Sequence, residues 1–291
     1  MGEVSKIAWT DATFNPWWGC TRVSPGCEHC YAEQLATVRR RLPVWGVDAD
    51  RKAMSAAYWR APVKWDRDAA RDGVRRRVFC ASMADVFEIL PDRNVAGWKV
   101  QGEARSRLWD LIAATPNLDW LLLTKRPENI DRLAPWDGSG SRIESIVTRP
   151  PWPTNVWLGV TAEDRRRAAE RLPILLDIPA RVRFVSHEPG LEAVDFRPWL
   201  SGGVHWVITG GESGPGARPY SIDWARHVVN TCRMFGAAPF VKQLGRHPFD
   251  ERGQQMHRRD MVHGTITDPK GGDPDEWPAD LRVRDCPAVS P

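Results

Sequence analysis

Six short apolar runs recur every few tens of residues, and they constrain the fold more than any other feature of the sequence. They are rich in Val, Ile, Leu, Phe and Trp and do not alternate with polar residues, which is the pattern of strands buried on both faces of a parallel sheet. The runs are Val78–Ala81, Leu118–Leu123, Val156–Val160, Val182–Val185, Trp206–Ile208 and Pro239–Val241.

The segments between these runs carry helix patterns. Val95–Ala114 has a helix-like apolar stripe, Ala162–Leu176 consists of good helix formers, and Ser221–Phe235 begins with a Ser cap and an early Asp. Strands and helices in alternation predict βαβ units and an α/β fold with a parallel sheet, either curled or open. We expect an earlier strand at Ile7–Trp9 and an irregular C-terminal extension over residues 246–291.

Polar side chains follow the apolar runs directly. Because the carboxyl ends of parallel strands meet at one edge of a sheet, they predict a polar pocket there. They are Ser82, Asp85, Thr124, Lys125, Arg126, Thr161, Glu163, Asp164, Ser186, His187, Glu188, Thr209, Glu212, Ser213, Lys242 and Gln243. Thr161 and Ser186 alone are typical of turns and caps. Lys125, Glu188 and Glu212 are charged groups placed immediately after buried strands, and they favour a binding site.

The loop Gly210–Gly216 follows the fifth apolar run and contains four glycines in seven residues. Glycine tolerates a positive φ and lets the backbone approach a ligand closely. At the end of a buried strand, Gly210 and Gly211 therefore strengthen the prediction of a site at this edge.

Three cysteines lie within eleven residues, with six residues between Cys20 and Cys27 and two between Cys27 and Cys30. Gly19, Pro25 and Gly26 predict a loop that wraps around a metal centre, and three thiolates suit either zinc or an iron–sulfur cluster. A structural zinc site needs a fourth ligand, for which His29, Cys80 or a remote residue is available. An iron–sulfur cluster with one open iron, or a catalytic zinc, needs only these three.

Composition bears on the compartment and on the partner. The chain has no apolar run long enough to cross a membrane and no signal-peptide core, so we expect a cytoplasmic protein with reduced thiols and no membrane partner. Clustered cysteines in that setting favour a metal over disulfides. The net charge of +4 permits a nucleic-acid partner without arguing for one, and the short arginine runs are typical of solvated helix faces.

The three-cysteine loop ahead of a β/α array resembles the radical S-adenosylmethionine (SAM) superfamily, and more closely a phage- and prophage-associated family of radical SAM proteins with a three-cysteine motif. The resemblance covers nearly the whole chain. Beside the cysteines, the matching stretches are Trp9–Pro16, Cys30–Glu33, Ser82–Phe87, Leu123–Pro127, Trp157–Val160, Glu188–Pro189, Gly210–Gly214, Lys242–Gly245 and Trp277–Arg284.

This resemblance implies a partial (β/α)6 TIM-type barrel over residues 1–245, with a cluster loop at residues 15–33, and an extension over residues 246–291 packed on the barrel. Cys20, Cys27 and Cys30 would hold three irons of a 4Fe-4S cluster, and SAM would bind the fourth. One electron, from a flavodoxin- or ferredoxin-like reductant, would cleave SAM to a 5′-deoxyadenosyl radical that abstracts hydrogen from a substrate. The phage association suggests a nucleotide or nucleic acid as that substrate.

The resemblance also bears on the strand-end residues, with two departures. The family's first cysteine gap is commonly three residues, and its Gly-Gly-Glu motif follows the second strand, whereas Gly210 begins this motif after a late strand. We therefore assign the SAM amino group to Ser82 and Asp85, and the ribose or carboxylate to Thr161 and Glu163. The remaining cofactor-binding candidates, of unspecified role, are Lys125, Glu188, Gly210, Gly211, Glu212, Ser213 and Lys242.

Two other hypotheses remain open from the sequence alone. The first is a zinc protein that uses the same three cysteines in a structural or hydrolytic site. The second is an interaction protein without catalysis, whose cysteines brace the fold.

Overall fold

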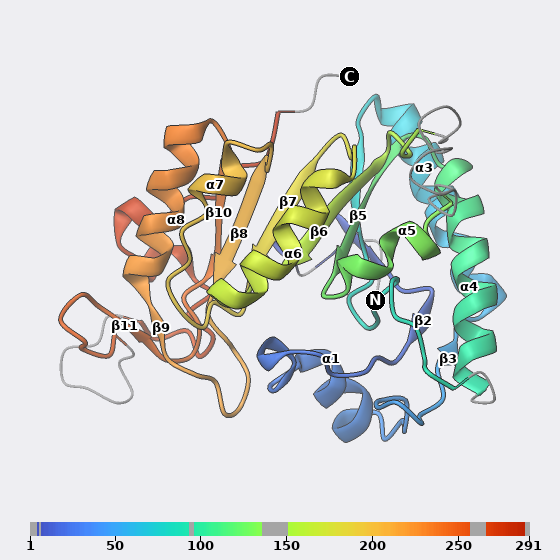
Figure 1. Cartoon of the computed structure of the whole chain (residues 1–291), viewed down its shortest axis with the longest axis horizontal. Coiled ribbons are helices and arrows are strands. Elements are labelled where there is room, and N and C mark those ends of the chain that lie inside the picture. The colour runs from blue at the N-terminus through green and yellow to red at the C-terminus, as the bar shows by residue number, and fades with distance from the viewer. Residues whose placement is uncertain (1–4, 6, 93–95, 136–150, 257–265, 289–291) are drawn as a thin grey trace. The chain divides into compact units, whose positions relative to one another are not determined.

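The computed structural model describes residues 5, 7–92, 96–135, 151–256 and 266–288 (Figure 1). The chain divides into two units, each made of several segments. The first contains residues 1–23, 31–158 and 178–181, and the second contains residues 24–30, 159–177 and 182–291. None of the described helices is long and apolar enough to cross a membrane.

The main sheet has seven strands in the order β1-β4-β5-β6-β7-β8-β10. In the first unit β4 pairs in parallel with both β1 and β5, and in the second unit β8 pairs in parallel with both β7 and β10. The strands are β1 (Ala12–Phe14), β4 (Arg76–Cys80), β5 (Leu118–Thr124), β6 (Val156–Thr161), β7 (Arg183–His187), β8 (Trp206–Gly210) and β10 (Ala238–Gln243).

This sheet confirms the predicted α/β class and its parallel strands. All six predicted runs form strands, and every residue of β6 and β8 is buried, as expected for strands covered on both faces. The first and last strands are not neighbours, so the strand order is that of an open sheet or a partial barrel. The sheet has seven strands, whereas the predicted (β/α)6 barrel has six.

The expected strand at Ile7–Trp9 is wrong, because the first strand is β1. Residues 7–10 form a turn instead, in which the Thr10 N–H donates to the Ile7 carbonyl at 3.1 Å. Trp9 is nevertheless buried and packs on Phe79, with ring centroids 4.6 Å apart. The apolar pattern at this position therefore reports burial, not strand pairing.

The first unit surrounds its strands with helices that follow sequence signals. In α3, Pro62 lies in the first turn, Gly73 ends the helix with a left-handed φ of 66°, and Trp65 and Ala69 are buried. In Figure 1, α4 runs beside β2 and β3. The other elements of this unit are α1 (Tyr31–Glu33), π-helical η2 (Gln34–Arg39), β2 (Trp17–Trp18), β3 (Lys52–Ala53), α2 (Ala56–Trp59), α3 (Ala61–Asp72), α4 (Ala96–Ala113), η3 (Pro127–Asn129) and α5 (Ile130–Leu133).

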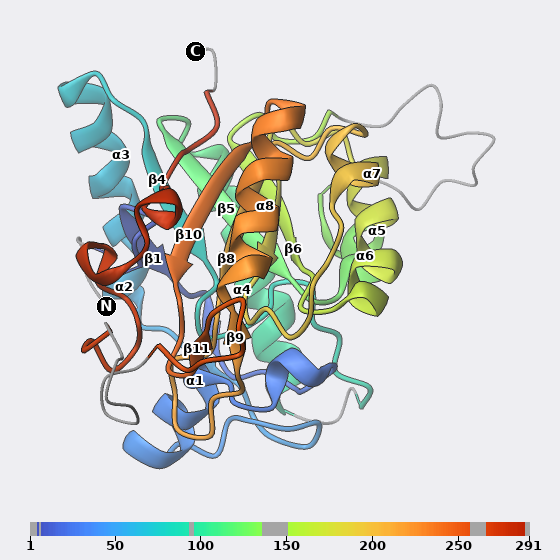
Figure 2. The same cartoon turned by 90° about the vertical axis from the view of Figure 1, so that its left-hand side faces the viewer.

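Two predicted helices are confirmed in the second unit, namely α6 and α8. For α8, the Ser221 hydroxyl accepts the Asp223 N–H at 3.2 Å, and Gly236 ends the helix. Figure 2 shows α8 lying along β8 and β10. The other elements of this unit are η1 (Pro25–Cys27), α6 (Arg165–Asp177), α7 (Arg197–Leu200), β9 (Tyr220–Ser221), α8 (Ile222–Phe235), β11 (Pro248–Phe249), η4 (Pro274–Glu276) and η5 (Ala279–Leu281).

The predicted helix Val95–Ala114 is α4 of the first unit, and its first predicted residue, Val95, lies outside the described residues.

The last part of the chain packs into the core of the second unit. Trp277, Leu281 and Val283 are buried in one apolar cluster with residues of α8 and β10. The Val241 N–H donates to the Val283 carbonyl at 2.8 Å, which extends the sheet's hydrogen bonding to the tail. The segment after residue 245 therefore fills a hydrophobic face of this unit.

Candidate functional site

The three clustered cysteines are free thiols of intermediate exposure. Cys20 belongs to the first unit, and Cys27 and Cys30 belong to the second. Within the described ranges, no three His, Cys, Asp or Glu side chains are grouped as a metal site. The donor chemistry nonetheless suits a thiophilic metal, because the chain offers three free thiols within one short stretch.

Cys20 lies beside a buried arginine. Arg126, two residues after the end of β5, donates from Nη1 to the Cys20 sulfur at 3.6 Å and from Nη2 to the Thr21 carbonyl at 2.5 Å. Its guanidinium is in turn held by Asp85 at 2.9 Å. One side chain therefore connects the sulfur to a residue predicted for the binding site.

Asp85 organises the ends of β4 and β5. Its carboxylate accepts the Thr124 hydroxyl at 2.8 Å, the Lys125 N–H at 3.1 Å and the Phe87 N–H at 3.0 Å. These bonds, together with Arg126, engage both oxygens of the carboxylate. Asp85 therefore acts in this structure as the support of Arg126, a role that differs from the predicted contact with SAM.

A second carboxylate completes this charge network. Glu88 is 1% exposed and forms two hydrogen bonds of 3.0 Å with Arg51, which also reaches the Thr21 hydroxyl at 3.0 Å. Glu88 also lies 3.4 Å from Arg126. The network contains two arginines and two carboxylates, so it balances its own charge without Cys20.

This environment disfavours an ionised Cys20 in the absence of a metal. Burial is the largest effect, and together with Glu88 and Asp85 it raises the pKa of the thiol, while Arg126 acts in the opposite direction. A coordinating metal deprotonates a thiol outright. Arg126 is then the group placed to stabilise the negative sulfur.

Residues Ser24–Cys30, which we call the cysteine loop, are anchored in the second unit by Glu163. This fully buried carboxylate accepts the Gly26 N–H at 3.2 Å and binds Arg171 of α6 at 2.8 Å. A Cβ at position 26 would lie 3.0 Å from the carboxylate, a tight contact that glycine avoids. Glu163 therefore holds the loop, a function that the sequence analysis did not assign to it.

Glu212 and Arg218 form a second anchor. The His29 Nδ1–H donates to Glu212 at 3.0 Å, and Arg218 binds Glu212 as well as Glu28 and the Pro25 carbonyl, both at 3.0 Å. Partial burial alone would raise the pKa of Glu212, but Arg218 and His29 outweigh it and hold the pKa below its usual range. Glu212 is therefore a carboxylate committed to the cysteine loop.

The glycines at the end of β8 make room for the neighbouring chain. A Cβ on Gly210 would lie 2.8 Å from the Gln243 carbonyl, and one on Gly211 would lie 2.8 Å from the Leu244 carbonyl. Both contacts are with backbone, which cannot move aside easily. Tight packing between β8 and β10 thus accounts for the two glycines that the sequence analysis assigned to a ligand.

Glu188 and Lys242 bind each other. The Lys242 ammonium lies 2.5 Å from a Glu188 oxygen, which Gln243 also contacts at 3.1 Å. The β8–β10 register shifts between Val241 and Gln243, and such an irregularity re-aims the side chain between them. These two predicted residues are therefore brought together at the ends of β7 and β10.

The other predicted residues are less engaged. Ser82 exchanges hydrogen bonds with Asn15 at 3.2 and 3.4 Å. Thr161 is fully buried, and its hydroxyl has no partner among the described residues. No hydrogen bond or ion pair is recorded in the described part of the chain for the side chains of Lys125 and Ser213. Among the predicted residues at the strand ends, the side chains of Lys125, Thr161 and Ser213 are therefore the uncommitted ones.

The cofactor-binding candidates chosen from the sequence did not include the arginines that anchor the cysteines. Arg126 immediately follows Lys125, which was chosen in its place, and Arg218 lies in a loop without periodicity. Arg171 did leave a signal, because it occupies the inward stripe of α6 with Ala168 and Leu172. A charged residue in such a stripe predicts a buried partner of opposite charge.

A buried polar chain lies at the ends of β7 and β8. His187 contacts the Glu192 carbonyl through Nε2 at 3.1 Å, so Nε2 carries the proton. Its Nδ1 then accepts from the Thr209 hydroxyl at 3.1 Å, and Thr209 accepts from Tyr220 at 2.8 Å. Burial lowers the pKa of His187 to about 4, which keeps the imidazole neutral at pH 7.

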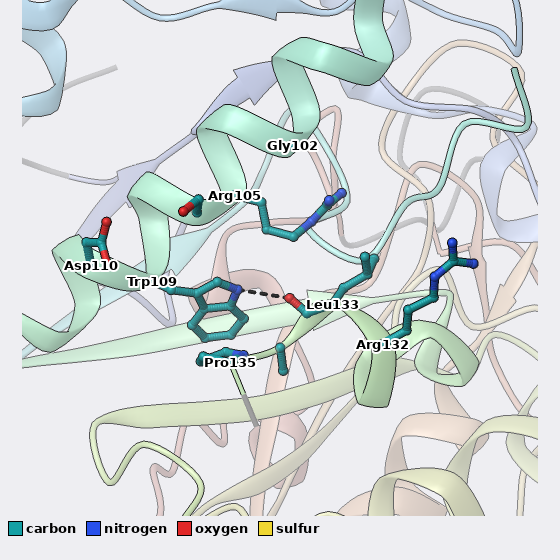
Figure 3. Close-up of a pocket in the computed structure, with 9 residues that line it drawn as sticks. Gly102, Arg105, Trp109, Asp110, Arg132, Leu133 and Pro135 are labelled. Carbon is teal, nitrogen blue, oxygen red and sulfur yellow. Dashed lines mark hydrogen bonds between the residues drawn. The ribbon is translucent and has the colours of Figure 1, made fainter. Parts of the chain in front are cut away.

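A surface pocket of about 360 Å³ lies in the first unit beside α4 and α5 (Figure 3). Its Trp109 donates from Nε1 to the Leu133 carbonyl at 3.1 Å. Arg105 lines it too, but its guanidinium already binds the carbonyls of Val86 and Glu88 at 2.7 and 2.8 Å. No predicted site residue is among those that line the pocket, so it is separate from the cysteine chemistry.

Comparison with known proteins gives one match. The family model described as "Protein of unknown function (DUF5131)" matches residues 4–269. Neither a curated protein nor a solved structure matches the chain.

Proposed function

The chain belongs to the DUF5131 family of proteins of unknown function, and we propose from its own residues that it is an iron–sulfur enzyme of the radical SAM type. Cys20, Cys27 and Cys30 would hold a 4Fe-4S cluster. The seven-strand sheet would be a partial (β/α)6 barrel with one further strand, since helical segments follow six of its strands. The cytoplasm and a nucleotide or nucleic-acid substrate remain parts of this proposal.

One observation carries the proposal: buried charged side chains hold the partly exposed cysteines in place. Arg126 reaches the Cys20 sulfur and Thr21, and Glu163 reaches Gly26, one residue before Cys27. Both anchors are almost completely buried, whereas the cysteines themselves are of intermediate exposure. Buried ion pairs have a large desolvation cost. Their presence next to the cysteines therefore indicates that the cysteines must be held in one fixed geometry.

When bound, the cluster and SAM would supply the electron and the adenosyl radical that abstracts hydrogen from the substrate. The chain's own groups would bind and orient these partners. Lys125, Thr161 and Ser213 have uncommitted side-chain groups, so they are the best placed to contact SAM or substrate. Glu163, Glu212 and Asp85 would not contact SAM or the substrate themselves. They would hold the cysteines and Arg126 in position.

A zinc site is the second candidate, and His29 is the observation that favours it. Its Nδ1 donates to Glu212 at 3.0 Å, which leaves Nε2 as the ligating nitrogen. A carboxylate that orients a histidine in this way is common at zinc sites. With three cysteines, His29 would complete a structural site that leaves no open position.

Anaerobic purification followed by metal analysis separates the two candidates. The iron–sulfur proposal expects a brown protein with about four iron and about four sulfide per chain, and 5′-deoxyadenosine after incubation with SAM and dithionite. Cys20→Ser should lose the metal, whereas Cys286→Ser, an exposed cysteine in the tail, should keep it. A colourless protein with one zinc per chain, lost on His29→Ala, would refute the iron–sulfur proposal and support the zinc site.

A further inference from the structure

Arg126 donates a hydrogen bond from Nη1 to the Cys20 sulfur at 3.6 Å. It is 6% exposed, and its second nitrogen donates to the adjacent Thr21 carbonyl. Asp85 at 2.9 Å and Glu88 at 3.4 Å hold its guanidinium in place. Because an arginine side chain stays protonated in proteins, a fixed positive charge lies beside the sulfur.

The side chains around Arg126 increase the effect that its contact with Cys20 has on the charge of the sulfur. Asp85 and Glu88 already balance the charges of Arg126 and Arg51, and all four side chains are nearly inaccessible to water. Negative charge that is added on Cys20 is therefore poorly screened by solvent. The N–H of Arg126 is the group in this unit placed to offset it directly.

We propose that Arg126 is a positioning residue that raises the reduction potential of the metal centre held by Cys20, by donating its N–H to the cysteine sulfur. The inference rests on the proposed iron–sulfur function. Adding one electron, taken from a low-potential reductant, makes the centre more negative without forming or breaking a bond. Hydrogen bonds to the cluster sulfurs and nearby positive charge stabilise that reduced form and so raise the potential.

The test compares midpoint potentials in an anaerobic redox titration followed by electron paramagnetic resonance. Arg126→Gln alone leaves Asp85 buried and unpaired, so the main variant is Arg126→Gln with Asp85→Asn, which removes both charges of the pair. We expect at least a tenfold less favourable reduction, a shift of 59 mV to more negative potential for a one-electron couple. Arg126→Lys keeps the charge but lacks the planar fork, so it should shift the potential by less.

Arg105→Lys is the matched control, because Arg105 is a half-buried arginine of the first unit that donates to the carbonyls of Val86 and Glu88 and lies over the Trp17 ring. It should keep the wild-type potential. Iron-loaded variants of Arg126 with an unchanged potential would overturn this inference and leave the proposed function intact. A folded double variant without iron would also overturn it, by making Arg126 a structural requirement. Wild-type protein without iron would overturn the proposed function and this inference with it.

Discussion

Replacing Glu163 by Gln tests whether a buried ion pair anchors the cysteine loop. Glu163 is completely buried, and Arg171 is 5% exposed. The two lie 2.8 Å apart, and the same carboxylate accepts the Gly26 N–H at 3.2 Å. Gln has nearly the same shape and keeps one oxygen acceptor, so the substitution removes the charge and little else.

The expected loss of stability depends on the interactions that Arg171 and Gly26 keep in the Glu163→Gln variant. Removing one partner of a buried ion pair costs about 3–5 kcal/mol, because the other charge stays buried without compensation. A retained neutral hydrogen bond contributes about 1 kcal/mol. The Arg171 guanidinium also keeps its bond of 2.7 Å to the Thr161 carbonyl. We therefore expect Glu163→Gln to lower the free energy of unfolding by about 2–4 kcal/mol.

Urea unfolding followed by tryptophan fluorescence measures this change. Glu170→Gln is the control, since Glu170 lies on α6, the helix that carries Arg171, and pairs with Arg166 and Arg167 at the surface. An exposed pair of this kind contributes about 0–1 kcal/mol. If Glu163→Gln destabilises the protein no more than Glu170→Gln, the buried pair is not an anchor. Metal content measured on the same samples reports whether the loop loses its ligand geometry as well.

Two further predictions concern stability. His187 has a pKa of about 4 when folded and an ordinary value of 6.5, so its contribution is fully present above pH 6.5 and is lost as the pH falls toward 4. We expect that His187→Gln loses this dependence, worth about 3 kcal/mol over that range, and a wild-type-like pH profile of the variant's unfolding free energy would contradict the assignment. Gly211→Ala should cost about 1–3 kcal/mol, because its Cβ would lie 2.7 Å from a Tyr220 carbon. Gly102→Ala, in an open part of α4, should stabilise by about 0.5–1 kcal/mol; equal urea midpoints for these two variants would refute the packing argument.

The sequence predicted the main sheet well because both faces of its strands are covered. An unbroken apolar run such as Val156–Val160 has few alternatives to a buried strand, and β6 is buried throughout. Short pairings left no comparable signal. The strands β2, β3, β9 and β11 have two residues each, and their positions depend on the chain that surrounds them.

For the candidate site, the sequence showed which polar residues follow the strands, but it did not show which side chains bind one another. Glu212 was singled out as a charged group after a buried strand, yet its partner His29 lies 183 positions away in the sequence. A carboxylate that binds a ligand and one that binds the protein's own loop look the same in one sequence. The difference between Lys125, which keeps its ammonium uncommitted, and Lys242, which binds Glu188, arises only from tertiary packing.

The burial of the tail also affects how this family should be delimited. The family match ends at residue 269, yet Trp277, Leu281 and Val283 lie in the same apolar cluster as Val241 of β10. A protein trimmed to the matched region would lose these side chains and leave the hydrophobic face under α8 open to water. Aggregation of such a trimmed protein would then reflect a missing piece of core and say nothing about its cysteines.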